Sequence, residues 1–144
     1  LFVPGVGQFI TSVGGFPIQR EGLGASGMKE TLRRLKKGGI VALFPEGTRS
    51  RDGELGEMKA GISVLASRAK VPVIPAAVAG SFEAWPRSRP FPMPHPLHVH
   101  FGPPVSVEEF QGRSAEEMTE LLRGRILDCS ASAREHLRRR MRLA

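Results

Sequence analysis

The segment 44–50, Phe-Pro-Glu-Gly-Thr-Arg-Ser, carries the residue types of a phosphate-binding turn placed after an apolar run. Pro45 presets φ and ends strand pairing, while Gly47 can adopt a positive φ. Arg49 offers a planar fork of donors that suits a phosphate, and the neighbouring Glu46 can fix the orientation of that fork. The segment therefore indicates binding of a phosphate ester, although a Pro-x-Gly string alone is also typical of an ordinary surface turn.

The residues on either side of this turn predict an α/β fold. The apolar run 40–44 and the run 73–78 read as strands, and a helix with its apolar stripe from Ile62 to Ala69 lies between them. Such a strand-helix-strand unit predicts parallel pairing with a right-handed crossover, in a sheet covered by helices on both faces. Ligands of such sheets bind beyond the carboxyl ends of the strands, where the turn would lie.

Two helices are expected upstream of the turn, because apolar residues recur there at helical spacing. The stripe of the first runs from Val6 to Val13 and closes at Gly14; that of the second runs from Met28 to Leu35 and stops at Gly38. Residues 16–20, which end in Arg20, read as a short extended piece between them.

The segment 97–101 alternates apolar residues with histidine, which predicts a later strand of the same sheet. Val99 and Phe101 would share one face, and His98 and His100 the other. Alternate histidines on an exposed strand are more often solvated than catalytic, so we interpret this pair as solvated.

A long helix is predicted to follow the capping box that begins at Ser114 and includes Glu117. Its buried stripe would run from Met118 to Cys129 and its end, residues 138–142, is strongly basic. Cys129 is the chain's only cysteine, which excludes an internal disulfide and a multi-cysteine metal cluster. Its position on the apolar stripe favours a buried thiol over a nucleophile.

Composition narrows the class of partner. The chain has 144 residues and a net charge of +7, which favours partners that carry phosphate: anionic lipid headgroups, coenzyme A or nucleic acid. Nucleic acid is not expected, because no stacking motif, zinc pattern or helix-turn-helix accompanies the charge. No apolar run approaches the roughly 20 residues of a membrane span. The proline-rich loop 81–96 suits either a membrane interface or a plain surface.

The 44–50 segment resembles the third motif of the glycerophospholipid acyltransferase family, whose members acylate glycerol 3-phosphate, lysophosphatidate and similar lysolipids. Residues 15–20 are similar to the family's second motif and residues 71–75 to its fourth, so the resemblance covers residues from about 15 to 80. It implies a glycerol-3-phosphate acyltransferase-like α/β fold. Its implied acceptor-binding residues are Arg20, Glu46, Gly47, Thr48 and Arg49, and Pro75 with the first helix would shape an apolar channel.

The family's first motif, a histidine followed five positions later by an aspartate, is missing. The chain's aspartates are Asp52 and Asp128, and neither follows a histidine at that spacing. In the family this histidine takes the proton of the acceptor hydroxyl. We therefore expect residues 1–144 to be a fragment, the carboxyl-terminal part of a single acyltransferase domain, with no catalytic residue in the chain and no activity of its own.

The resemblance implies transfer of a fatty acyl group from acyl-CoA, or acyl carrier protein, to a hydroxyl of lysophosphatidate or a related lysolipid. No metal or tightly bound cofactor is expected, because a thioester donor already carries the activated acyl group. The implied partners are the lysophospholipid acceptor, the thioester donor and a membrane surface, at its cytoplasmic face. The alternative is a non-catalytic phospholipid- or acyl-binding module on the same fold.

Overall fold

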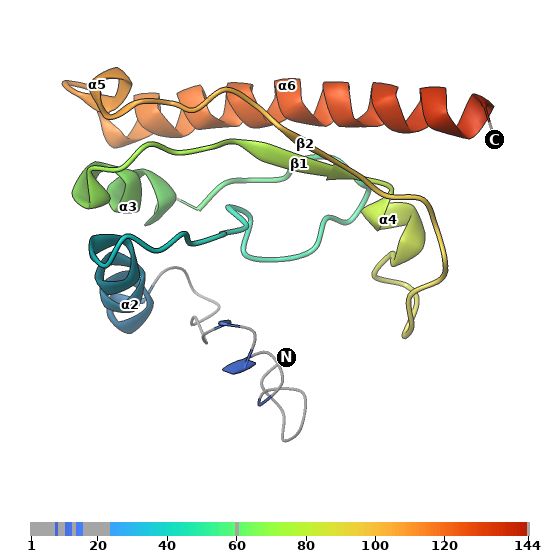
Figure 1. The fold of residues 1–144 in the computed structure, drawn as a ribbon, viewed down its shortest axis with the longest axis horizontal. Helices are drawn as coiled ribbons and strands as arrows, with labels where there is room; N and C mark the ends of the chain where they lie inside the picture. Colours follow the sequence, from blue (N-terminus) through green and yellow to red (C-terminus); the bar gives the residue numbers. More distant parts are fainter. Residues whose placement is uncertain (1–7, 9–10, 13, 16–23, 60, 144) are drawn as a thin grey trace. The chain divides into compact units, whose positions relative to one another are not determined.

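The computed structural model describes residues 8, 11, 12, 14, 15, 24–59 and 61–143 (Figure 1). The chain divides into two compact units, Leu1–Ala42 and Leu43–Ala144. The predicted phosphate-binding turn, residues 44–50, lies in the second unit.

The first unit contains the helix α2, which spans Ala25–Lys36. It ends where the sequence predicts, because Gly38 adopts a φ of +78°. The Lys37 N–H donates to the Arg34 carbonyl and the Gly38 N–H to the Leu35 carbonyl. Upstream, Gln8, Thr11 and Ser12 are helical. The apolar stripe of that expected first helix, residues 6, 9, 10 and 13, lies outside the described residues, as does the expected extended piece 16–20.

The second unit is built around one long helix. Its elements in chain order are α3 (Gly61–Ala69), β1 (Ala76–Ala79), α4 (Ser81–Ala84), β2 (His98–Phe101), α5 (Val107–Phe110) and α6 (Ala115–Arg142). Figure 1 shows α6 running alongside the β1–β2 pair, with α3 and α5 near its amino-terminal end. The capping box at Ser114 is confirmed: its Oγ accepts from the Glu117 N–H at 3.2 Å, and the Glu117 carboxylate accepts from the Ser114 N–H at 2.7 Å.

The predicted parallel strand-helix-strand core is not present in the described part of the chain. The only sheet there is antiparallel, with β1 paired to β2 so that Ala76 faces Phe101 and Ala79 faces His98. The run 40–44 is not a strand, and Phe44 is 82% exposed. A strand forms only where a partner satisfies its backbone groups, and among the described residues no segment is paired with this run.

The apolar face of α6 holds the second unit together through two buried clusters. One gathers Met118 and Leu122 of α6 with Val105, Phe110 and Ala66. The other packs Ala79 of β1 against Ala133 and Leu137 of α6. Burial of apolar surface stabilises the fold by about 25 cal/mol per Å². These two clusters therefore hold α6 against the β1–β2 pair as two packed layers.

The face of β2 that meets α6 is the reverse of the one expected. Val99 is 47% and Phe101 68% exposed, whereas His98 and His100 are half-buried against α6. The interpretation of the two histidines as solvated is therefore wrong. Period-two alternation assigns residues to faces, but it does not say which face the long helix covers.

Candidate functional site

The 44–50 turn borders a pocket of about 430 Å³ in the second unit, and polar and charged residues line it. The lining comes from the turn itself, from the loop that follows it, and from Arg87 in the segment after α4. The lining residues are Glu46, Thr48, Arg49, Ser50, Arg51, Asp52, Glu54, Gly56, Glu57, Lys59 and Arg87.

The turn itself has the geometry that its sequence predicts. The Gly47 N–H donates to the Phe44 carbonyl at 3.1 Å, and Gly47 adopts a φ of +66°, which side chains disfavour. The Lys59 N–H donates to the Pro45 carbonyl at 2.9 Å and so closes the loop back onto the turn. Thr48 and Arg49 are thereby presented at the surface of the pocket.

Glu46 braces the loop rather than the arginine beside it. Its Oε2 accepts from the Gly56 N–H at 2.9 Å, and a Cβ added at Gly56 would lie 2.8 Å from that same oxygen. The expectation that Glu46 orients Arg49 is therefore wrong for the described residues, in which Arg49 has other partners. The loop brings the Gly56 N–H within reach of the Glu46 carboxylate, and this backbone donor needs an acceptor. Glu46 therefore bonds it instead of Arg49.

The loop after the turn is held by its own polar side chains. Ser50 Oγ accepts from the Gly53 N–H at 2.9 Å and lies 2.8 Å from the Glu54 carbonyl. Asp52 Oδ1 accepts from the Glu54 N–H at 3.0 Å. This backbone N–H, followed by the Ser50 hydroxyl, lowers the pKa of Asp52, because both donors favour the ionised carboxylate.

Two residues that follow α4, Trp85 and Arg87, hold the turn's polar side chains. The Arg49 guanidinium lies 4.8 Å above the centre of the Trp85 ring, and its Nη1 is 3.5 Å from the Trp85 carbonyl. Arg87 Nη2 donates to Thr48 Oγ1 at 2.7 Å. The Trp85 indole N–H in turn donates to the Arg89 carbonyl at 3.1 Å. This bond fixes the orientation of the ring on which Arg49 stacks.

Arginines of α6 fix the outer part of the loop. Arg134 donates to Glu54 Oε1 and to the Gly53 carbonyl, each at 2.7 Å, and Arg123 donates to the Gly56 carbonyl at 3.0 Å. The hydrogen bond to Glu54 raises the pKa of Arg134. The pocket wall is thus anchored on the long helix.

Four carboxylates and four cations line the pocket, but they differ in whether they already have bonding partners. Glu46 and Asp52 accept backbone N–H groups, and Glu54 is paired with Arg134. By contrast, within the described part of the chain the lining cations form no ion pair; they are Arg49, Arg51, Lys59 and Arg87. Glu57 is the fourth carboxylate of the lining. Guanidinium forks that form no ion pair, beside three carboxylates that already have partners, make a site suited to an anion such as phosphate.

The remaining predicted site residues are not brought into this pocket. Arg20 lies outside the described residues. Pro75 is buried just before β1, where its carbonyl accepts from the Gly102 N–H at 2.9 Å and lies 3.6 Å from Cys129 Sγ. Burial raises the pKa of the Cys129 thiol, which agrees with its predicted role as a packed core residue.

Sequence reasoning missed Arg87 and Lys59, which line the pocket, and Trp85, which holds the pocket residue Arg49. Trp85 and Arg87 stand in the loop 81–96, whose aromatic and cationic residues suggested a membrane interface or a plain surface. The signal that could have found them is that same mixture, since a tryptophan beside arginines can also stack on the arginine of a neighbouring turn.

Comparison with known proteins places this geometry among acyltransferases. Residues 1–79 match the family model described as Acyltransferase. A 1-acyl-sn-glycerol-3-phosphate acyltransferase of Limnanthes douglasii is 29% identical over 125 residues, which cover 85% of this chain and 44% of that protein. A protein of the same name from Bacillus subtilis is 37% identical over 75 residues, which cover 52% of this chain and 37% of that protein.

A solved structure has the same fold over nearly the whole chain. The 1-acyl-sn-glycerophosphate (LPA) acyltransferase PlsC from Thermotoga maritima matches with a TM-score of 0.69 and 25% identity, over 95% of this chain and 52% of that one. The chain therefore spans about half the length, or less, of the relatives it matches.

Proposed function

Because the chain belongs to the acyltransferase family, whose model matches residues 1–79, we propose that it supplies the acceptor-binding part of a lysophosphatidate acyltransferase. The complete protein transfers a fatty acyl group from a thioester, acyl-CoA or acyl carrier protein, to the free hydroxyl of 1-acylglycerol 3-phosphate. The thioester C–S bond breaks, an ester C–O bond forms, and the hydroxyl proton leaves for a base. The names of the relatives support this acceptor.

The observation that carries the proposal is the pocket at the 44–50 turn. Arg49 and Arg87 each make one contact that fixes their position, to Trp85 and to Thr48, and neither is neutralised by a carboxylate in the described residues. A phosphate monoester that enters the pocket accepts hydrogen bonds from both guanidinium groups. Charge-assisted bonds of this kind orient the headgroup as well as hold it.

The same proposal assigns no metal and no tightly bound cofactor to the acyl transfer, because the donor thioester already carries the activated acyl group. The partners are then the acceptor lipid, the thioester donor and a membrane surface at its cytoplasmic face, without nucleic acid. Exposed apolar side chains in the loop that carries Arg87 support contact with lipid: Phe91 is 77% and Met93 54% exposed. Among the described residues, no helix combines the length and hydropathy needed to cross a bilayer.

The second candidate is a phospholipid-binding module without catalytic activity. It is favoured by one observation: none of the four histidines in the 144 residues is followed five positions later by an aspartate. A transferase of this family needs a base for the acceptor hydroxyl, so the complete protein must provide that pair for the first candidate to hold.

Acyl transfer by the complete protein separates the two. We expect turnover of lysophosphatidate with acyl-CoA or an acyl carrier protein thioester, and Arg49→Ala should raise the KM for the acceptor while leaving the KM for the donor nearly unchanged. Arg138→Ala, which removes an equal charge from a helix end outside the pocket lining, is the matched control. Absence of turnover with either donor favours the binding module, and an equal loss toward both substrates refutes the assignment of Arg49.

A further inference from the structure

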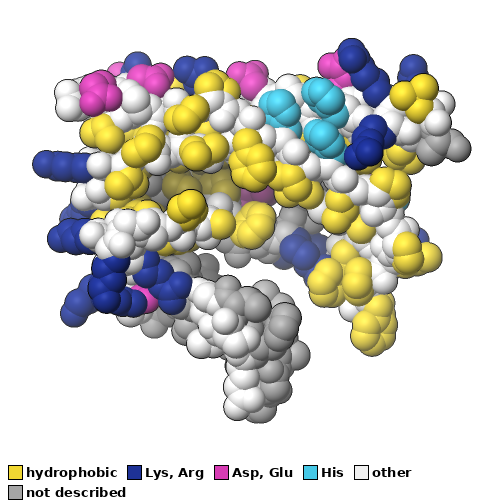
Figure 2. Space-filling view, in the orientation of Figure 1, with side chains coloured by type: hydrophobic (Ala, Val, Ile, Leu, Met, Phe, Trp, Pro, Cys, Tyr) yellow, Lys and Arg dark blue, Asp and Glu magenta, His cyan; other side chains and the backbone are white. Residues whose placement is uncertain are grey.

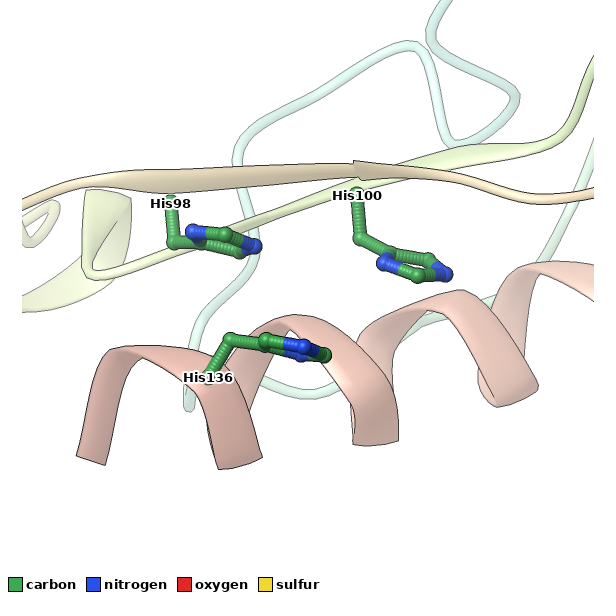
Figure 3. Close-up of side chains that lie close together, drawn as sticks. All are labelled: His98, His100 and His136. Carbon is green, nitrogen blue, oxygen red and sulfur yellow. The ribbon is translucent and has the colours of Figure 1, made fainter. Parts of the chain in front are cut away.

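Three of the chain's four histidines meet between β2 and α6, away from the pocket just described (Figure 3). His98 and His100 project from the same face of β2, and His136 lies opposite them on α6. The ring centres of His98 and His136 are 5.2 Å apart, and those of His100 and His136 are 5.9 Å apart. Figure 2 shows histidine side chains gathered in one patch on the surface.

The nitrogen atoms of these rings are close enough to share one ion. One ligand atom from each ring lies within 4.8 Å of the other two. In a tetrahedral zinc site with Zn–N bonds of 2.0–2.1 Å, neighbouring nitrogens are about 3.3 Å apart. The rings of His98 and His136 now stack with an angle of 5° between their planes, and those of His100 and His136 with an angle of 23°. A modest rotation of half-exposed side chains about their own bonds would turn the nitrogens toward a common centre.

His136 is already prepared for this role by its hydrogen bond. Its Nδ1 lies 2.8 Å from the carbonyl oxygen of Ser132, one turn earlier on α6. A carbonyl only accepts, so Nδ1 carries the proton and Nε2 keeps its lone pair. A backbone carbonyl bound to the second nitrogen of a metal-ligating histidine is the usual way in which proteins fix the ligand's tautomer and orientation.

The elements that carry the three rings are held rigidly together. Ala79 of β1, the strand paired with β2, packs against Ala133 and Leu137, which flank His136 on α6. On the basic end of α6, Arg139 is paired with Glu135, so one of the nearby positive charges is neutralised. The rings are therefore held by a packed core and not by a loose surface loop.

We propose that His98, His100 and His136 form a binding site for one divalent transition-metal ion of the zinc class, which links β2 to α6. Imidazole nitrogen is a favoured ligand of Zn²⁺, and three imidazoles leave the fourth position to water. The ion would act as a structural link between strand and helix, separate from the acyl-transfer chemistry. The sequence predicts no metal for the acyl transfer, because the thioester donor already carries the activated acyl group. The three histidines come together only when the strand and the helix pack.

The test is a titration of the untagged 144-residue chain with Zn²⁺, followed by calorimetry, and with Co²⁺, followed by visible absorption. We expect one equivalent to bind and to raise the melting temperature, since the ion binds the folded chain in preference to the unfolded one. His98→Gln, His100→Gln and His136→Gln should each weaken binding by more than about tenfold, because even the loss of an outer-shell partner costs 10- to 100-fold. His95→Gln, which alters the histidine outside the cluster, should change nothing.

A second measurement does not depend on any variant being folded. In the wild-type chain labelled with ¹⁵N-histidine, Zn²⁺ should shift the imidazole nitrogens of three histidines and leave those of His95 unchanged. The proposal fails if Zn²⁺ at one equivalent shifts no imidazole signal. It fails equally if the signals of His95 move with the others, or if the His95→Gln variant loses as much affinity as the cluster variants.

Discussion

The guanidinium of Arg49 lies 4.8 Å above the ring of Trp85, although the two residues are 36 positions apart in the chain. This contact joins the turn that carries the phosphate-binding signature to the loop 81–96, whose sequence suits either a membrane interface or a plain surface. Arg49 remains exposed toward the pocket. The contact with Trp85 already restricts its side-chain conformations, so phosphate binding loses less conformational entropy.

Replacement of Trp85 by alanine should weaken binding of lysophosphatidate without abolishing it. A cation–π contact at an exposed site contributes about 0.5–1 kcal/mol, which corresponds to a roughly two- to fivefold loss of affinity. Trp85→Phe keeps an aromatic ring and should lose less. Phe101→Ala, on β2 and 68% exposed, alters an aromatic residue outside the pocket lining and is the control. Calorimetry with monomeric short-chain lipid measures all three. An effect of Phe101→Ala as large as that of Trp85→Ala would rule out the stacking contact as the cause.

The contacts of Arg134 predict a stability difference between two arginines of α6. Arg134→Met removes the bonds to Glu54 and to the Gly53 carbonyl, and should lower the free energy of unfolding by about 1 kcal/mol. Arg139→Met breaks only an exposed pair with Glu135 one turn away on the same helix, and should cost less than about 0.5 kcal/mol. Urea denaturation measures both. Equal losses would show that the loop is not anchored on α6.

The lowered pKa of Asp52 predicts a pH dependence of stability. A carboxylate whose pKa is lower in the folded chain stabilises it fully above the unfolded value of about 3.9, and this contribution disappears as the pH falls through the folded-state pKa. The difference in melting temperature between the wild type and Asp52→Asn should therefore be constant above about pH 5 and should shrink at more acidic pH. A difference that stays constant down to pH 3 would contradict the bonding described for this loop.

Gly80 and Gly112 offer a matched pair for testing how β1 and β2 meet α6. Both have a positive φ, +87° and +75°, so alanine is strained at either position by about 1–2 kcal/mol. At Gly80 an added Cβ would also lie 2.2 Å from the Pro96 carbonyl oxygen, whereas at Gly112 nothing lies within 4 Å. Gly80→Ala should thus be clearly more destabilising than Gly112→Ala in thermal unfolding. Similar losses would mean that residues 80 and 96 do not pack as described.

Local signals in the sequence predicted most of the helices. The glycine after α2, the stripe of α3 and the capping box of α6 each act within a few residues, so they are readable without knowledge of the tertiary structure. The parallel sheet was the main error. The run 40–44 is apolar enough for a buried strand, but a strand also needs a neighbour, and in the described part of the chain β1 is paired antiparallel with β2.

For the site too, the residues of one local segment were predictable from the sequence, and those from distant segments were not. Gly47, Thr48 and Arg49 could be identified because their roles depend on one contiguous turn. Trp85, Arg87 and the anchoring Arg134 could not, because they contact the turn and its loop from other parts of the chain. The histidine cluster is the clearest case, since His136 is separated from His98 by most of α5 and α6.

Calorimetric binding of two lipids with the same acyl chain, lysophosphatidate and the corresponding monoacylglycerol, tests the acceptor-site assignment most directly, because they differ only in the phosphate. We predict that the chain binds lysophosphatidate more tightly. Arg49→Gln should remove most of that preference, about 1.5–3 kcal/mol for a charge-assisted bond, while Arg138→Gln should preserve it. Equal affinity of the wild type for the two lipids, or a preference that survives Arg49→Gln unchanged, would contradict the assignment of this pocket to the acceptor phosphate.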